Sequence, residues 1–154
     1  MTMKSEDAIS GSLGKCYIVL DGNRYDCINL IKIEAKSEKK KVEVPILGKP
    51  GKGNKAAGWN GTGSLSFHYN SSMFREQVHE YIKTGKDFYF DIEVLNEDPT
   101  SSVGRQYAIL KNCNLDNATL ALIDSTAEYL EDPYDFTFDD YELPEKFTTL
   151  EGML

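Results

Sequence analysis

The side chains best suited to catalysis or metal binding are few in this sequence and stand far apart. Its histidines are His68 and His79, and its cysteines are Cys16, Cys27 and Cys113, with no Cys-x-x-Cys pair among them. A structural zinc site needs four such ligands at short spacings, and a catalytic zinc site needs three. We therefore predict no metal site and no cofactor, and we expect both histidines on the surface.

The stretch 47–63 contains two glycine patterns that suggest phosphate binding. The run 48–53 (GKPGKG) resembles a phosphate-binding loop, but it lacks the Gly-Lys-Ser/Thr ending, since Asn54 and Lys55 follow instead. A second pattern, G-x-G-x-x-A over 51–56, matches a relaxed dinucleotide fingerprint. The residues after it (GWNG) replace the helix whose N-terminus would meet the pyrophosphate. Both patterns are too incomplete to predict a nucleotide site.

Neighbouring carboxylates occur at Asp139-Asp140 and at Glu131-Asp132, where they could attract Ca²⁺. No twelve-residue loop with a central glycine and a terminal glutamate surrounds either pair. We interpret both pairs as solvated acids. Since no G-x-S-x-G elbow is present either, the sequence predicts a protein that is not an enzyme.

The composition limits the classes of protein to which the chain can belong. The chain has 154 residues, of which 40% are hydrophobic and 27% charged, which is typical of a globular protein. Its formal charge of −8 is opposite to that of a protein that grips nucleic acid by neutralising phosphates. No apolar run approaches the roughly 20 residues of a membrane helix. An odd number of widely spaced cysteines favours free thiols in a reducing compartment.

The spacing of apolar residues predicts antiparallel strands and one helix. Apolar and polar residues alternate over 31–38, 64–69 and 134–139, which is typical of strands with one buried and one wet face. Asp21-Gly22 predicts a hairpin turn. A helix is predicted over 71–84, and four residues at helical spacing form its expected core face: Phe74, Val78, Tyr81 and Ile82.

These elements predict a single domain over residues 1–154 with three less regular parts. They are a flexible arm at 1–14, a long Gly- and Lys-rich loop at 47–63, and an extended tail at 141–154. A loop of that length in a compact domain is usually functional or disordered. The predicted fold class is mainly β, an antiparallel β-sandwich or barrel with one α-helix packed outside.

Charge is segregated along the chain. Residues 31–55 contain eight lysines and three glutamates, whereas residues 116–154 contain eleven acids and one lysine. Such runs are usually solvated surfaces. The alternative is self-complementarity, in which the basic region of one copy meets the acidic region of the next, a contact that builds rings or filaments.

Two segments resemble those of phage tail tube proteins. Residues 58–67 (GWNGTGSLSF) resemble the G-x-N-G-T-G-x-x-x-F stretch that follows the long loop in that family. Residues 130–147 (LEDPYDFTFDDYELPEKF) resemble the family's C-terminal run. Over nearly its whole length the chain is similar to the tube subunits of contractile tails and of defective prophages of the PBSX type.

The resemblance implies a subunit of hexameric rings that stack head-to-tail into a hollow tube for DNA or, in a tail-like bacteriocin, for ions. The implied partners are further copies of the chain, the tail sheath, the baseplate hub, and the tape-measure and tail-terminator proteins. DNA is implied only as non-specific cargo, and no membrane is involved. The implied place of assembly is the cytoplasm of the bacterial host, and the product is a virion or tail-like particle.

Three sets of residues are then expected to act in assembly. The interface between subunits or rings is expected on the long loop, at Lys49, Pro50, Lys52, Asn54, Lys55, Trp59 and Asn60. The candidates for lining the bore are Lys32, Glu34, Lys36, Glu38, Ser64, Ser66 and His68. The acidic surface that would receive the loop of a neighbour is expected at Asp135, Asp139, Asp140 and Glu142.

Two alternatives remain open from the sequence. One is the tube subunit of a cellular secretion system, which the same resemblance would cover. The other is a monomeric β-barrel that binds a small ligand, which would need an enclosed apolar cavity. The charged second faces of the predicted strands disfavour the latter.

Overall fold

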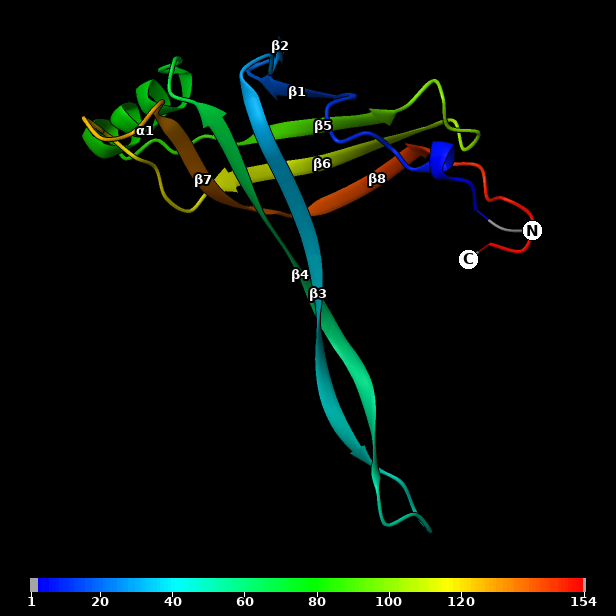
Figure 1. Ribbon diagram of the computed structural model, residues 1–154. Coiled ribbons are helices and arrows are strands. Elements are labelled where there is room, and N and C mark those ends of the chain that lie inside the picture. Colours follow the sequence, from blue (N-terminus) through cyan, green and yellow to red (C-terminus); the bar gives the residue numbers. More distant parts are fainter. Residues whose placement is uncertain (1–2, 154) are drawn as a thin grey trace.

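The computed structural model describes residues 3–153, which form a β-sandwich from which a long two-stranded arm projects (Figure 1). A short 3₁₀ turn, η1 (Ser5–Asp7), comes first, and one helix, α1 (Met73–Thr84), lies at an end of the sandwich. The strands are β1 (Gly14–Leu20), β2 (Asn23–Asp26), β3 (Leu30–Pro45), β4 (Lys52–His68), β5 (Phe90–Glu97), β6 (Arg105–Leu115), β7 (Glu131–Phe138) and β8 (Asp140–Glu145). The mainly β, antiparallel fold class with one outer helix is confirmed.

Strand β6 joins the two layers of the sandwich. The strand order is β2-β1-β5-β6-β7-β4-β3, with β8 paired to β6 as well. Strand β6 pairs with β5 and β8 along most of its length and reaches β7 only through Asn114 and Leu115. The layers are therefore β2-β1-β5-β6-β8 and β7-β4-β3, and one strand is shared at their junction.

The core lies between these layers and is rich in aromatic rings. Ile92, Cys113 and Phe136 have no exposed surface at all. Phe74, from the first turn of α1, closes one end with its ring centroid 5.1 Å from that of Phe90 and 5.2 Å from that of Tyr134. Fully burying side chains of this size stabilises a fold by about 1.5–3 kcal/mol each. The body thus has enough apolar contact to be stable as a subunit.

The hairpin and the end of the helix agree with the sequence. Asp21 and Gly22 both have positive φ angles, 51° and 78°, as the turn that links β1 to β2 requires. Gly85 ends α1 in the left-handed conformation, with φ 77°, and its N–H donates to the carbonyl of Tyr81. The predicted turn and the predicted helix stop are both confirmed.

The predicted core face of the helix is correct in its first half and wrong in its second. Phe74 is buried and Val78 half-buried, but Tyr81 and Ile82 are 49% and 57% exposed. The helix meets the end of the sandwich with its first turn, so its last turns extend past the sheets (Figure 1). The apolar residues do recur at helical spacing. How many of them are buried depends on how far the helix overlaps the sandwich.

The segment 47–63 is not a long loop, and this prediction is wrong. Strand β3 continues to Pro45 and β4 begins at Lys52, so only residues 46–51 connect them. The two strands pair from Leu30 with Phe67 to Pro45 with Lys52 and form the arm that leaves the body (Figure 1). A glycine-rich sequence is a strand here because a long partner strand satisfies its backbone hydrogen bonds.

Both terminal segments are more structured than predicted. Within the predicted flexible arm, Ser101 Oγ donates to the carbonyl of Asp7 at 2.9 Å and the N–H of Ser10 donates to Asp98 Oδ2 at 3.0 Å. The predicted extended tail contains most of β8, and the N–H of Thr148 donates to the carbonyl of Val103 at 2.7 Å. Residues 1, 2 and 154 of these two predictions lie outside the described residues.

Candidate assembly surfaces

The outer face of β7-β4-β3 collects the residues predicted to line a bore. In the antiparallel register Lys32 lies opposite Ser66 and Glu34 lies opposite Ser64, so their side chains share one face. The alternate residues, Ile33 and Leu65, face the core. We call this outer side the polar face, and it contains all seven predicted residues: Lys32, Glu34, Lys36, Glu38, Ser64, Ser66 and His68.

Strand β7 adds two acids to the polar face that sequence reasoning did not assign to it. Asp135 lies beside Ser64 and Glu131 lies beside His68. With Glu34 and Glu38 they make four carboxylates against two lysines, a formal charge of −2. Only the pairing of β7 with β4 reveals this, because the two strands are far apart in the sequence.

Ion pairs on the polar face occupy both of its lysines. Lys36 Nζ lies 2.9 Å from Glu34 Oε1, and Lys32 Nζ lies 3.5 Å from Glu34 Oε2. The hydrogen bond and charge of Lys36, followed by those of Lys32, hold the pKa of Glu34 below its usual value. The pKa of Lys36 is raised by the same contact. Each lysine of the polar face therefore lies beside the same carboxylate.

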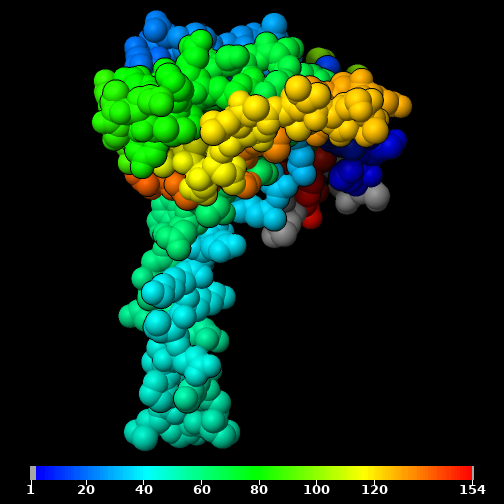
Figure 2. Space-filling view, turned by 90° about the vertical axis from the view of Figure 1, so that its left-hand side faces the viewer, coloured from blue at the N-terminus to red at the C-terminus, as the bar shows by residue number. Residues whose placement is uncertain are grey.

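The arm, which we define as residues 37–60, has no third strand against it. All its residues are exposed except Gly53, which is half-buried. It contains six lysines and two glutamates, a formal charge of +4, so the rest of the −8 chain carries −12. Figure 2 shows the arm standing clear of the body. A basic projection on an acidic body is the charge pattern of a surface made for a second molecule.

One side of the arm is apolar. Val42 and Val44 of β3 and Ile46, directly after it, alternate along the chain and are 45%, 38% and 43% exposed. Gly53 lies opposite Val44 and leaves room for the side chain of Ile46, since a Cβ on Gly53 would lie 3.1 Å from Ile46 Cδ1. Leu47, at the start of the turn, is fully exposed. An ordered apolar stripe in water is typical of a contact surface.

The predicted interface residues are divided between the two ends of the arm. Lys49 and Pro50 lie in the turn at the tip, and Trp59 and Asn60 lie at the root, next to the body. Three others occupy the distal half of β4: Lys52, Asn54 and Lys55. All seven lie on the arm, but they are divided between its turn and β4 and do not form one patch.

Trp59 fixes the root of the arm to the body. Its ring centroid lies 6.1 Å from that of Phe138, and 46% of the residue stays exposed. Open grooves lie on both sides of it, one toward Tyr141 of β8 and one toward Thr137 of β7. Trp59 thus contacts the body through one ring and keeps nearly half of its surface exposed.

The two sequence segments that carry the family resemblance are cross-strand partners. Gly61 lies opposite Phe138, and Gly63 lies opposite Phe136. A Cβ on Gly63 would overlap the Phe136 ring and lie 2.7 Å from the carbonyl oxygen of Glu34. The glycines are needed because the phenylalanine rings lie against the β4 backbone where a Cβ would be. The same rings cover this part of the glycine-rich strand.

The four acids predicted as a receiving surface are engaged within the chain. Asp135 accepts a hydrogen bond from Asn117 at 2.8 Å, and Asp139 accepts one from Asn112. Glu142 pairs with Lys111 at 3.0 Å. Asp140 accepts from the N–H of the next residue, Tyr141, at 2.8 Å. All four remain exposed, but Asp135 lies on the polar face of β7 whereas Glu142 lies on β8.

Three strands have an open edge. Among residues 3–153 the outer edge of β3 pairs with no further strand, β2 pairs only with β1, and β8 pairs only with β6. Open edges present unpaired N–H and C=O groups, which are a template for pairing with another chain. The sequence indicated that strands exist but not which of them lie at the edges.

Neither a metal site nor a membrane helix is found in the part of the chain that the structure describes. Residues 3–153 contain no group of three or more His, Cys, Asp or Glu side chains that could hold a metal ion. No helix within the same range is long and apolar enough to span a bilayer. The features left to explain are therefore surfaces: the polar face, the arm and the open edges.

Comparison with known proteins gives consistent likenesses over most of the chain. The family model described as "Phage tail tube protein" matches residues 1–145. The chain is 36% identical over 148 residues to phage-like element PBSX protein XkdM of Bacillus subtilis (strain 168), which covers 96% of this chain and 98% of that protein.

Solved structures show the same fold at low identity. A chain in the sheath–tube complex of an extracellular contractile injection system (PVC) is similar with a TM-score of 0.68 and 10% identity, over 90% of this chain and 93% of that one. The tail tube of SPP1 gives a TM-score of 0.62 and 9% identity, over 88% of this chain and 78% of that one. At such low sequence identity, these structures are evidence for the fold alone.

Proposed function

The chain belongs to the phage tail tube protein family, and on that premise we propose that its copies form hexameric rings that stack into a hollow conduit. The observation that carries the proposal is the two-sided sheet β7-β4-β3. One side is sealed by the aromatic core and the other is the polar face, which is wet and charged. A sheet with these two sides is suited to stand between a packed wall and a water-filled channel.

The open edges supply a way to close a ring. When the edge of β3 of one copy pairs with an edge strand of the next, the contact is heterologous, because the two surfaces differ. Repeated with a rotation that closes, such a contact gives a ring in which every β3 edge is paired. This also removes the long edge of β3, which would otherwise favour uncontrolled association.

The charge of the polar face suits a passage for DNA. Its four carboxylates exceed its two lysines, and both lysines are paired with Glu34. A hexamer of −8 chains carries −48 in total. Phosphates that meet such a wall find few cations to neutralise them, so the polymer slides instead of binding. Ions in a tail-like bacteriocin would use the same wet channel.

The arm is then the link between rings. The arm leaves the body in one direction (Figure 2). It has a charge of +4 and an apolar stripe made of Val42, Val44 and Ile46. The surface that receives it on the neighbouring copy includes Asp139, Asp140 and Glu142, which are all exposed, whereas Asp135 belongs to the polar face. Charge complementarity of this kind sets the orientation of a contact.

Further partners follow from the assemblies in which the fold occurs. The similar solved structures come from an anti-feeding prophage baseplate, a PVC sheath–tube complex and a PVC sheath/tube terminator. They are consistent with a tail sheath, a baseplate and a tail terminator as partners of the tube, and we propose a baseplate hub and a tape-measure protein as further partners. We place assembly in the host cytoplasm.

The test is electron microscopy of the purified chain at high concentration, with light scattering in parallel. We expect rings or tubes from the natural chain. Lys52→Glu with Lys55→Glu reverses two charges on the arm and should abolish stacking, because it opposes like charges across the contact. The matched control is Lys83→Glu with Lys86→Glu, two exposed lysines near the end of α1.

The outcomes are distinct. Tubes from the control but not from the arm variant support the proposal. If both variants formed tubes equally well, the arm would not be part of the contact between rings. A natural chain that stays at 17.3 kDa at every concentration would contradict assembly itself.

A further inference from the structure

Two of the three cysteines face each other where the β1–β2 hairpin ends. The register Tyr17 opposite Asp26 continues to Cys16 opposite Cys27, and the N–H of Cys27 donates to the carbonyl of Cys16 at 2.9 Å. Hydrogen-bonded partners in an antiparallel pair have Cα atoms about 5.5 Å apart. That separation is the commonest one for a disulfide, so the backbone is already in place for a bond between them.

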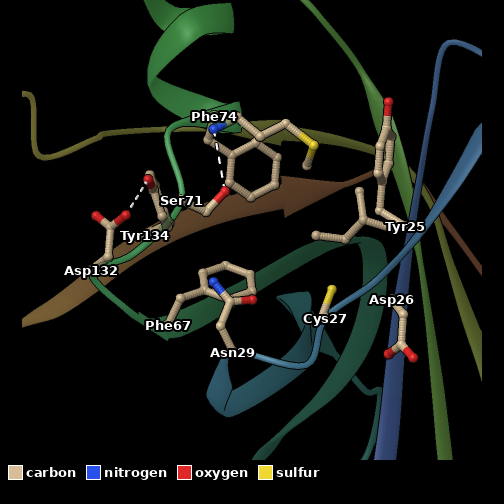
Figure 3. Close-up of a pocket in the computed structure, with 11 residues that line it drawn as sticks. Tyr25, Asp26, Cys27, Asn29, Phe67, Ser71, Phe74, Asp132 and Tyr134 are labelled. Atoms are coloured by element: carbon tan, nitrogen blue, oxygen red, sulfur yellow. Dashed lines mark hydrogen bonds between the residues drawn. The ribbon is translucent and has the colours of Figure 1, made fainter.

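A pocket gives a small molecule access to one of these thiols. Cys27 is half-buried and lines a cavity of about 150 Å³ between the first turn of α1 and β2, together with Tyr25 and Met73. Figure 3 shows its sulfur directed into this space. Cys16 lies behind it and is only 3% exposed. A reagent of the size of hydrogen peroxide can therefore meet Cys27 first.

The two thiols also differ in acidity. The hydrogen bond between them lowers the pKa of Cys27 and, together with burial, raises the pKa of Cys16. A thiolate is the reactive form of cysteine. Because Cys27 lines the pocket and Cys16 lies behind it, Cys27 is the attacking group and Cys16 the group that resolves the product. Cys113 differs from both, since it is fully buried and burial raises its pKa to about 12.

We propose that Cys16 and Cys27 are an oxidisable dithiol that a peroxide converts into a disulfide within the chain. The Cys27 thiolate attacks one peroxide oxygen, and the O–O bond breaks to leave a sulfenic acid on Cys27 and hydroxide, which is protonated to water. The Cys16 thiol then attacks that sulfur, forms the S–S bond and releases a second water. The two thiols lose two electrons and two protons, and the peroxide is reduced to water.

The position of the bond gives it a structural effect. Cys27 lies in the short link between β2 and β3, the strand that becomes the arm. A disulfide there fastens the beginning of β3 to β1, inside the body. It also closes a short loop, which lowers the entropy of the unfolded chain. The oxidised subunit should therefore be more stable than the reduced one, whether or not it assembles.

The experiment treats the folded natural chain with hydrogen peroxide, alkylates the remaining thiols and maps the peptides without reduction. We expect one linked peptide pair, Cys16 with Cys27, and an alkylated Cys113. We also expect Tm to rise by about 5–10 °C, as a closed loop of this length implies, and to fall back on reduction with dithiothreitol.

Variants separate the two roles. With Cys16→Ser, the sulfenic acid on Cys27 should persist and be trapped by dimedone. With Cys27→Ser, Cys16 should stay reduced. Cys113→Ser is the matched control and should form the same link. No link in the folded natural chain, oxidation of Cys113 at the same rate as Cys27, or links only between chains would each overturn the proposal. None of these readouts depends on ring formation.

Discussion

Strands β3 and β4 pass through two regions with opposite surroundings. In the body they pack on β7, and Leu65 and Phe67 of β4 are 2% and 6% exposed. In the arm the same two strands have only each other, and nearly every residue is exposed. The body is thus stabilised by its own core, whereas the arm is a two-stranded hairpin whose apolar stripe is not covered by any other part of residues 3–153. One pair of strands serves both the subunit and the contacts outside it.

The sequence marks the border between the two regions. In the body the apolar residues of β3 have odd numbers, Ile33 and Ala35. In the arm the apolar residues Val42 and Val44 of β3, and Ile46 directly after it, have even numbers. The register is irregular between Lys39 and Lys41, where the change occurs. The apolar side of the arm is therefore not a continuation of the core side, which is what a surface for a different partner requires.

The largest effect is expected in the body, from the buried ion pair of Arg75 and Asp132. Arg75 Nη1 lies 2.7 Å from Asp132 Oδ2, and the two side chains are 13% and 3% exposed. Arg75→Ala leaves the carboxylate buried and without its cation, which costs about 3–5 kcal/mol. Urea unfolding followed by circular dichroism measures the loss.

The control for that variant is Arg105→Ala. Arg105 pairs with Glu145 on the surface, where the side chains are 50% and 42% exposed, and an exposed pair of this kind contributes little. Equal urea midpoints for the two variants would show that the inner pair does not support the body.

The next largest loss of stability is expected from Gly63→Ala, in the part of β4 that pairs with β7 inside the body. The new Cβ has no room between the Phe136 ring and the Glu34 carbonyl, and overpacking costs about 1–3 kcal/mol. Gly51→Ala, in the turn at the tip of the arm, has open space around it and should unfold at the same temperature as the natural chain. Thermal unfolding of both variants makes the comparison, and an unchanged Tm for Gly63→Ala would refute the close approach.

A smaller effect on stability is expected from the apolar stripe of the arm. Val44→Asp with Ile46→Asp removes no core contact, so the free energy of unfolding should change by no more than about 0.5 kcal/mol. The same variant should fail to form tubes, because its stripe no longer suits an apolar partner. Loss of stability comparable to that of Gly63→Ala would mean that the arm is part of the folding unit.

The smallest effect concerns acid. The pKa values of Glu34 and Asp98 are lowered in the folded chain, Glu34 chiefly by its hydrogen bond to Lys36 and Asp98 chiefly by its hydrogen bond to Thr100. The folded state then binds fewer protons than the unfolded one, so the stability they contribute is present above their ordinary values of 4.5 and 3.8 and is lost as the pH falls. Glu34→Gln should flatten the dependence of Tm on pH below about 4.5. If the Tm of the variant fell with pH as steeply as that of the natural chain, Glu34 would not contribute to acid sensitivity.

Local patterns predicted the parts of the fold that local chemistry determines. The Asp21-Gly22 turn, the stop at Gly85 and the polar side of the strands each depend on residues close together in the sequence. Alternation alone placed Glu34 and Ser64 on a wet face. The strand register then put them side by side.

The features that were missed depend on partners distant in the sequence. Gly61 and Gly63 suggest a loop until Phe138 and Phe136 are known to cover them. The apolar stripe of the helix reads as a core face until the end of the sandwich is known to stop below Tyr81. The acids that β7 adds to the polar face are likewise invisible until strand pairing is known.

The measurement that tests the central claim most directly is a cryo-electron microscopy reconstruction of tubes grown from the pure chain. We predict six copies per ring around an open channel, with Glu34, Ser64 and Asp135 on the channel wall and the arm against the adjacent ring. A filament without a channel, or a tube with this face turned outward, would contradict the account.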